Sequence, residues 1–142
     1  MSLAMTKQER ETFLAEVRIG VVSIPTEGRG PLTVPIWYIY EPGGELKFVT
    51  GRESRKAKLL AQADRISFCV YNDSLPYRYV SVEGPIVAIE PADLERDIRR
   101  FGHRYLGPEG GDQHAERVKD QGSILVRMRP EQWYTVDFGK LG

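Results

Sequence analysis

Much of the chain consists of short segments rich in apolar residues and bounded by turn residues, which predicts β-strands, and one of them alternates between apolar and polar positions with a period of two. The alternating segment is RISFCVY at residues 65–71. The segment 77–90 is long enough for a bent strand, with Gly84-Pro85 as the expected bulge. Turn residues such as EPGGE, after LTVPIWYIY, separate the segments. The predicted strands cover residues 18–24, 32–40, 46–50, 65–71, 77–90, 123–129 and 132–138.

Helical periodicity is confined to a few segments. Thr6 and Glu9 have the spacing of a capping box, which predicts a helix over residues 6–17. Ser54 is a candidate N-cap for a second helix. A third helix is expected to begin at Pro91, with one apolar face formed by Leu94, Ile98, Phe101 and Tyr105. The following GPEGGDQ is expected to be a flexible loop, and a short polar helix is expected near residues 112–119.

This order of elements favours an antiparallel barrel. Six or seven strands with turns at short intervals, and helices only as insertions, fit a small closed barrel with packed helices. A parallel Rossmann sheet would need alternating strands and helices, which the pattern lacks. A length of 142 residues without an internal repeat or a long linker indicates a single domain, residues 1–142.

Composition narrows the possible partners. Lysine plus arginine equals aspartate plus glutamate at 20 each, whereas a general nucleic-acid binder would carry a basic excess. A single cysteine, Cys69, excludes an internal disulfide and a multi-cysteine zinc site. No apolar run approaches the roughly 20 residues of a membrane span, and no signal peptide is recognisable. We therefore expect a cytoplasmic protein that does not bind nucleic acid or membranes.

The sequence contains no recognisable catalytic motif. Its two histidines, His103 and His114, lie near no serine, cysteine or aspartate in a known arrangement, and we interpret both as surface residues. Glu90 and Asp93 flank an expected helix start, where carboxylates satisfy the helix dipole. If the protein is an enzyme, its reactivity is expected to come from a cofactor.

One local cluster of charge indicates an anion site. In TGRESRKAKLL, Arg52 and three basic residues of the next helix crowd a helix start, where cations are unfavourable. The Ser54 side chain can cap that helix and leave further N–H groups free, with the Thr50 hydroxyl close by. Hydroxyls, N–H groups and cations at a strand–helix junction are typical of a phosphate site. The alternative is that the basic turn is only solvated.

The strand VPIWYIY carries the second candidate feature. Pro35 removes a ladder donor, which indicates an edge, a bulge or a place where the backbone faces a ligand. Trp37, Tyr38 and Tyr40 follow it and can serve as core packing, as dimer packing or as flat walls for a planar ring. Together with a phosphate site, the last alternative fits a ring with a phosphorylated tail.

In order along the chain, VPIWY, FVTGRESRKAKLL, RISFCVY and YVSVEG resemble the FMN-binding split barrels of the pyridoxamine 5′-phosphate oxidase-like superfamily. The resemblance runs from about residue 20 to residue 90, and the last strands show a weaker similarity to the same family. Within the superfamily, the chain is most similar to small proteins that bind the deazaflavin coenzyme F-420. The resemblance implies a mainly β fold, an antiparallel split β-barrel of six or seven strands with a few packed helices. It also implies a homodimer with cofactor sites at the subunit interface.

The same resemblance supplies candidate cofactor-binding residues. Lys56 matches the lysine that holds the cofactor phosphate, and Ser54 matches a second phosphate contact. The strand around Pro35 matches the segment whose backbone lines the pyrimidine side of the ring, and residues 77–79 match a segment presented by the partner subunit in some relatives. The candidates are Val34, Pro35, Ile36, Trp37, Thr50, Gly51, Ser54, Arg55, Lys56, Lys58, Tyr77 and Tyr79. No side chain is assigned as acid or base, and no metal is expected.

The implied activity is hydride transfer between a bound cofactor and a small unsaturated or quinone-like molecule. F-420 and FMN share a ring, a ribityl chain and a phosphate, but F-420 adds a lactyl-polyglutamate tail that Arg52, Arg55 and Lys58 could bind. This favours F-420, with FMN as the alternative. The chain lacks the basic C-terminal substrate segment of true pyridoxamine phosphate oxidases. A non-catalytic flavin-binding protein and a barrel without a ligand remain alternatives.

Overall fold

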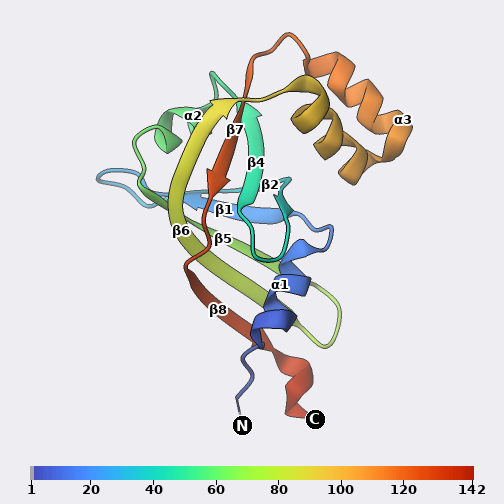
Figure 1. Cartoon of the computed structure of the whole chain (residues 1–142). Helices are drawn as coiled ribbons and strands as arrows, with labels where there is room; N and C mark the ends of the chain where they lie inside the picture. Colours follow the sequence, from blue (N-terminus) through green and yellow to red (C-terminus); the bar gives the residue numbers. More distant parts are fainter. Residues whose placement is uncertain (1) are drawn as a thin grey trace.

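The computed structural model describes residues 2–142 as an antiparallel barrel that is split along one side (Figure 1). The strands are hydrogen-bonded in the order β2-β1-β5-β6-β7-β4-β3, and β8 also pairs with β6. Their bounds are β1 Gly20–Ile24, β2 Leu32–Ile36, β3 Ile39–Tyr40, β4 Leu46–Gly51, β5 Arg65–Asn72, β6 Arg78–Pro91, β7 Ser123–Met128 and β8 Gln132–Asp137. The expected mainly β split barrel is confirmed, and the strand count is eight because one predicted strand is divided.

The interior of the barrel follows the alternation seen in the sequence. In β1, β4 and β5 every second residue is buried, and Phe48 of β4 and Phe68 of β5 are among the largest fully buried side chains of the core. Tyr38, between β2 and β3, is also fully buried. The helix α1, Lys7–Ala15, adds buried Phe13 and Leu14 to the same core. Its predicted capping box is present, with Thr6 and Glu9 bonded to each other's backbone N–H groups. This core fixes the barrel wall on which the candidate site lies.

The predicted strand 32–40 is divided at Trp37 and Tyr38 by a side chain from far along the chain. The Tyr105 hydroxyl accepts a hydrogen bond from the Tyr38 N–H at 3.0 Å and lies 2.9 Å from the Tyr38 carbonyl oxygen. It also lies 2.7 Å from the carbonyl oxygen of Arg18. The backbone groups of Tyr38 therefore have partners without a strand ladder, and the chain can turn there from β2 to β3.

The long strand β6 belongs to two parts of the sheet and bends between them. Its first half pairs with β5 and β8, and its second half pairs with β7. The register shifts between Ile86 and Ala88, so the bulge lies beyond the predicted Gly84-Pro85. Gly84 has a different role, because a Cβ there would lie 1.7 Å from the carbonyl oxygen of Arg129. Only glycine lets these two backbones pass so closely.

A helical hairpin interrupts the chain between β6 and β7 (Figure 1). It consists of η1, a π-helix over Leu94–Arg99, and α3, Arg100–Val118, which breaks at Gly107 where φ is 78°. The expected helix start at Pro91 is wrong, because Pro91 ends β6 and the Asp93 side chain caps η1. The expected flexible loop is also wrong, because the helix resumes at Pro108 immediately after the break.

Glycine contacts hold the two arms of this hairpin together. A Cβ on Gly102 would lie 2.9 Å from the carbonyl oxygen of Gly111, and one on Gly111 would lie 2.4 Å from the backbone nitrogen of His103. The two helical arms therefore touch backbone to backbone. This tertiary contact outweighs the weak helix propensity of Gly110 and Gly111.

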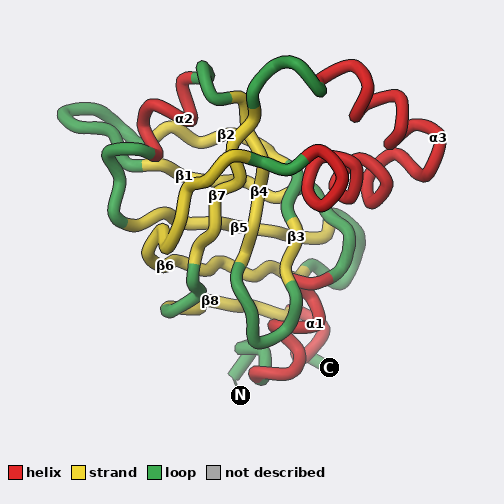
Figure 2. Tube along the Cα trace, turned by 45° about the horizontal axis from the view of Figure 1, so that its top comes forward, coloured by secondary structure: helices red, strands yellow, loops and turns green. Residues whose placement is uncertain are grey.

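Two short helices complete the fold. The helix α2, Arg55–Leu60, lies at the end of β4, on the side of the barrel opposite α3 (Figure 2). The helix η2, Phe138–Leu141, ends the chain close to the N-terminal segment (Figure 1). Within residues 2–142, none of the helices has both the length and the apolar character that crossing a bilayer requires.

Candidate functional site

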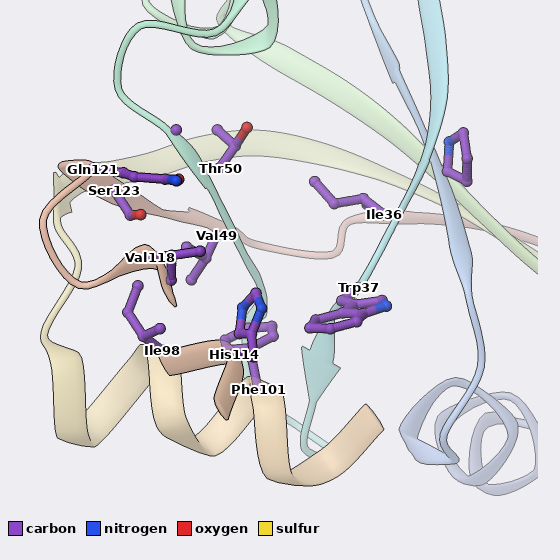
Figure 3. A pocket seen from close by; sticks show the side chains of 12 residues that line it. Ile36, Trp37, Val49, Thr50, Ile98, Phe101, His114, Val118, Gln121 and Ser123 are labelled. Carbon is purple, nitrogen blue, oxygen red and sulfur yellow. The ribbon is translucent and has the colours of Figure 1, made fainter. Parts of the chain in front are cut away.

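A cavity of about 390 Å³ lies in the split of the barrel (Figure 3). The end of β2 and the following residue, Trp37, form one wall of the cavity. The end of β4 forms a second wall, and the helical hairpin lies over both walls. None of the side chains that line the cavity carries a formal charge when histidine is neutral. They are Pro35, Ile36, Trp37, Val49, Thr50, Gly51, Ile98, Phe101, His114, Val118, Gln121 and Ser123.

Two strand edges without a ladder partner face this split. β2 is the last strand of the sheet on one side and pairs only with β1. On the other side, β3 pairs with β4 only at Leu46 and Lys47, so residues 48–51 pair with β7 alone. Unpaired edges present rows of N–H and C=O groups. A flat ligand with donors and acceptors on its rim can bind between such edges.

Aromatic rings form the side of the cavity next to the hairpin. Trp37 contacts two residues of α3. It is stacked on Tyr105 with centroids 4.9 Å apart and an interplanar angle of 4°. The centroid of the His114 ring lies 5.2 Å from that of Trp37, and the two rings are tilted by 58°. Figure 3 shows Trp37, His114 and Phe101 grouped at the end of the cavity next to the hairpin. The hairpin is thus docked on the barrel through Trp37.

Hydroxyls and cations gather where β4 leads into α2. The Thr50 hydroxyl, in a residue only 7% exposed, lies 3.2 Å from the Ser54 hydroxyl. The Ser54 side chain also caps α2 by accepting the Ala57 N–H at 3.1 Å. The first N–H groups of the helix, those of Arg55 and Lys56, are left for a ligand or solvent. In residues 2–142, no carboxylate lies within 4.0 Å of the charged groups of Arg55, Lys56 or Lys58.

The structure brings together most of the residues predicted from the sequence. Five candidates line the cavity: Pro35, Ile36, Trp37, Thr50 and Gly51. Ser54 contacts one of them, and the three basic candidates lie on the adjoining helix α2. Val34 instead packs against the barrel core.

Tyr77 and Tyr79 lie elsewhere on the chain. They border a shallow apolar depression with Cys69 and Tyr71 on β5. The resemblance assigns this segment to the partner subunit's site, so its position within one chain leaves that prediction untested. The burial of the Cys69 thiol raises its pKa, which makes it a poor nucleophile at neutral pH.

His114 is the residue that sequence reasoning missed. The expectation of a surface histidine in a loop is wrong, because the residue lies on α3 and lines the cavity. Partial burial lowers its pKa, and the nearby Arg117 lowers it further. By contrast, His103 is exposed, and its Nε2 lies 2.7 Å from Oδ1 of Asp112. No group of three or more metal-ligating side chains occurs in residues 2–142.

Comparison with known proteins agrees with this architecture. The profile of the pyridoxamine 5′-phosphate oxidase family matches residues 6–137, nearly the whole chain. The chain belongs to this family. No curated protein sequence matches it.

Solved structures of this family's fold include a conserved hypothetical protein, Rv2991 of Mycobacterium tuberculosis. It is 25% identical to the chain with a TM-score of 0.81, over 99% of this chain and 89% of that one. An F-420 reductase is 19% identical, with a TM-score of 0.73 over 87% of this chain and 94% of that one. HutZ, a heme storage protein of Vibrio cholerae, is 15% identical, with a TM-score of 0.60 over 92% and 89% of the two chains. Because these names differ so much, the shared fold alone does not settle the function of this family member.

Proposed function

We propose that the protein is a deazaflavin- or flavin-dependent oxidoreductase that transfers a hydride between its cofactor and a small unsaturated or quinone-like molecule. The observation that carries this proposal is the shape and charge of the split. Within residues 2–142, the cavity is an uncharged slot between two unpaired strand edges, and hydroxyls and cations without acidic partners gather at one end of it.

The end at α2 suits the phosphate of such a cofactor. Thr50 and Ser54 offer hydroxyls, and the first turn of α2 offers N–H groups and the Lys56 ammonium. Charge-assisted hydrogen bonds of this kind are the strong ones in proteins. A Cβ added to Gly51 would meet no protein atom within 4 Å, so the backbone at this point is open to a ligand.

The uncharged part of the slot suits the cofactor ring. The edges of β2 and β4 offer backbone groups that could pair with the polar rim of a pyrimidine-type ring, while the side chains of Ile36 and Val49 could bury its flat faces. A reduced flavin or deazaflavin supplies a hydride to an acceptor when it is bound. The protein's contribution is to hold the ring, exclude water and present the acceptor.

The density of positive charge favours F-420 over FMN. One phosphate is served by Lys56 with the hydroxyls, yet Arg55 and Lys58 lie on the same short helix without acidic partners among residues 2–142. Arg52 lies close by, with its guanidinium next to Gly122. These further cations fit an acidic tail. FMN, which has no such tail, is the alternative cofactor.

A homodimer is part of the proposal. Tyrosine side chains are exposed on β5 and β8, Tyr71 at 56% and Tyr134 at 67%, and Tyr134 stacks on Tyr79 of β6. Apolar surface of this kind is typical of an interface. A second subunit covering it could present residues near Tyr77 and Tyr79 to the site. Light scattering at micromolar concentration should give a dimer mass, and a monodisperse monomer would exclude shared sites.

Fluorescence titration tests the choice of cofactor. The purified protein should bind F-420 more tightly than FMN, and added salt should reduce that difference because the tail contacts are ionic. Equal or tighter FMN binding would favour the alternative cofactor. Steady-state turnover with a quinone then separates an oxidoreductase from a protein that only stores or senses the cofactor.

A further inference from the structure

The hairpin places one polar ring in the slot. The glycine contact between Gly102 and Gly111 fixes how the second arm of α3 crosses the first. His114 lies three residues after Gly111, almost one helical turn, on the face that also presents Val118 to the cavity. Phe101 of the first arm lines the same cavity. The crossing of the two arms of the hairpin therefore fixes the position of His114 in the cavity.

The imidazole of His114 has no hydrogen-bond partner among residues 2–142, although it contacts Trp37. His103, on the same hairpin, is bound to Asp112. Partial burial and the nearby Arg117 lower the pKa of His114, which favours the neutral form of its ring. A neutral imidazole offers one N–H donor and one acceptor nitrogen. One donor therefore lies free next to an indole.

The other polar groups of the cavity are also uncharged. Gln121 and Ser123 line it, and their side chains have no hydrogen-bond partner in residues 2–142. The end of the cavity at Trp37 and His114 has aromatic walls and lies away from the phosphate end at Thr50. A carboxylate or a phosphate is disfavoured at this end, because its desolvation would go uncompensated. This end suits a planar, neutral molecule with a carbonyl oxygen.

We propose that Trp37 and His114 form the acceptor subsite, with the acceptor ring against the indole and the His114 N–H donating to its carbonyl oxygen. The acceptor is then a conjugated ketone, a quinone or an enone. This inference rests on the proposed function. It places the His114 N–H at the carbonyl oxygen of the acceptor. This oxygen gains negative charge when the acceptor takes a hydride from the reduced cofactor, and a fixed donor is most effective there.

Binding of menadione, a neutral naphthoquinone, tests this subsite without turnover. The protein is saturated with oxidised F-420, and a parallel sample is left without it. Because the chain has two histidines, their imidazole NMR signals are assigned from a single His103 variant. Menadione should shift the His114 signals saturably and leave those of His103 unchanged. A His114 signal that does not respond would overturn the proposal.

Two substitutions separate the hydrogen bond from packing. His114→Phe keeps a ring against Trp37 but removes the donor, and should weaken menadione binding about three- to ten-fold, the scale of one neutral hydrogen bond. His114→Gln restores a donor and should recover part of the affinity. His103→Phe is the matched control and should bind like the parent. Parent-like binding by His114→Phe would overturn the proposal.

Cofactor titration of the same variants distinguishes a failure of the acceptor subsite from a failure of the proposed function. His114→Phe should leave the affinity for F-420 unchanged. If that affinity falls as much as menadione affinity, His114 contacts the cofactor and the acceptor subsite is refuted. If no cofactor binds but menadione still shifts the His114 signals, the proposed function fails, whereas Trp37 and His114 still form a binding site for a neutral ring ketone.

Discussion

Replacing Tyr105 with phenylalanine should loosen the hairpin that covers the site. The Tyr105 hydroxyl accepts from the Tyr38 N–H at 3.0 Å and lies 2.7 Å from the Arg18 carbonyl oxygen, so Tyr105→Phe removes one accepted and one donated hydrogen bond. The stack on Trp37 is kept, because it needs only the ring. At about 1 kcal/mol for each bond, plus the cost of an unpartnered Tyr38 N–H, the free energy of unfolding should fall by about 1–3 kcal/mol.

Urea denaturation followed by tryptophan fluorescence measures this loss. The control is Arg29→Ala, because Arg29 is exposed and its side chain has no hydrogen bond or ion pair within residues 2–142, so the change should alter the free energy of unfolding by less than about 0.5 kcal/mol. Amide hydrogen exchange in residues 94–118 should also speed up in Tyr105→Phe and not in the control. If both variants are equally stable, Tyr105 does not anchor the hairpin and the reasoning about the divided strand is wrong.

Three further changes test the phosphate end and the N-terminal helix. Lys56→Ala should weaken cofactor binding by about 1.5–3 kcal/mol, measured by titration, and Lys7→Ala on α1 is the control of equal charge that should bind like the parent. Gly51→Ala should keep or slightly raise thermal stability, because the added Cβ meets no protein atom within 4 Å. The same substitution should weaken cofactor binding in the titration, and unchanged affinity would mean that the ligand does not lie against this backbone. Hydrogen bonds from Lys140 and from a backbone N–H lower the pKa of Glu9 from its ordinary value of 4.5 to about 2. The Glu9 carboxylate therefore stabilises the fold above pH 4.5, and this stabilisation is lost as the pH falls from 4.5 towards 2. Glu9→Gln should therefore flatten the dependence of unfolding free energy on pH across that range, and an unchanged profile would mean that the ion pair contributes nothing in solution.

Features set by neighbours in the sequence were predicted well. The capping box of α1 and the Ser54 cap of α2 need only residues three positions apart. The alternation of β5 reports burial on one face of a strand, whatever its partners are. The basic turn after β4 was also recognisable, because its charges contradict the helix dipole locally.

Features set by distant contacts were not predictable from local patterns. The division at Tyr38 depends on the hydroxyl of Tyr105, 67 positions away. The second arm of α3 contains Gly110 and Gly111, which read as a loop until the crossing with Gly102 is known. His114 could join the candidate site only once that crossing was known, since nothing near it in sequence marks a pocket.

The central claim is that the split between β2 and β4 holds the cofactor ring, with its phosphate at α2. The most direct measurement is a crystal structure of the protein with oxidised F-420. The account predicts difference density for the ring in the split beside Trp37, and for the phosphate within hydrogen-bond distance of Ser54 and Lys56. Density for the cofactor on the outer face near Tyr71, or anywhere outside the split, would contradict it.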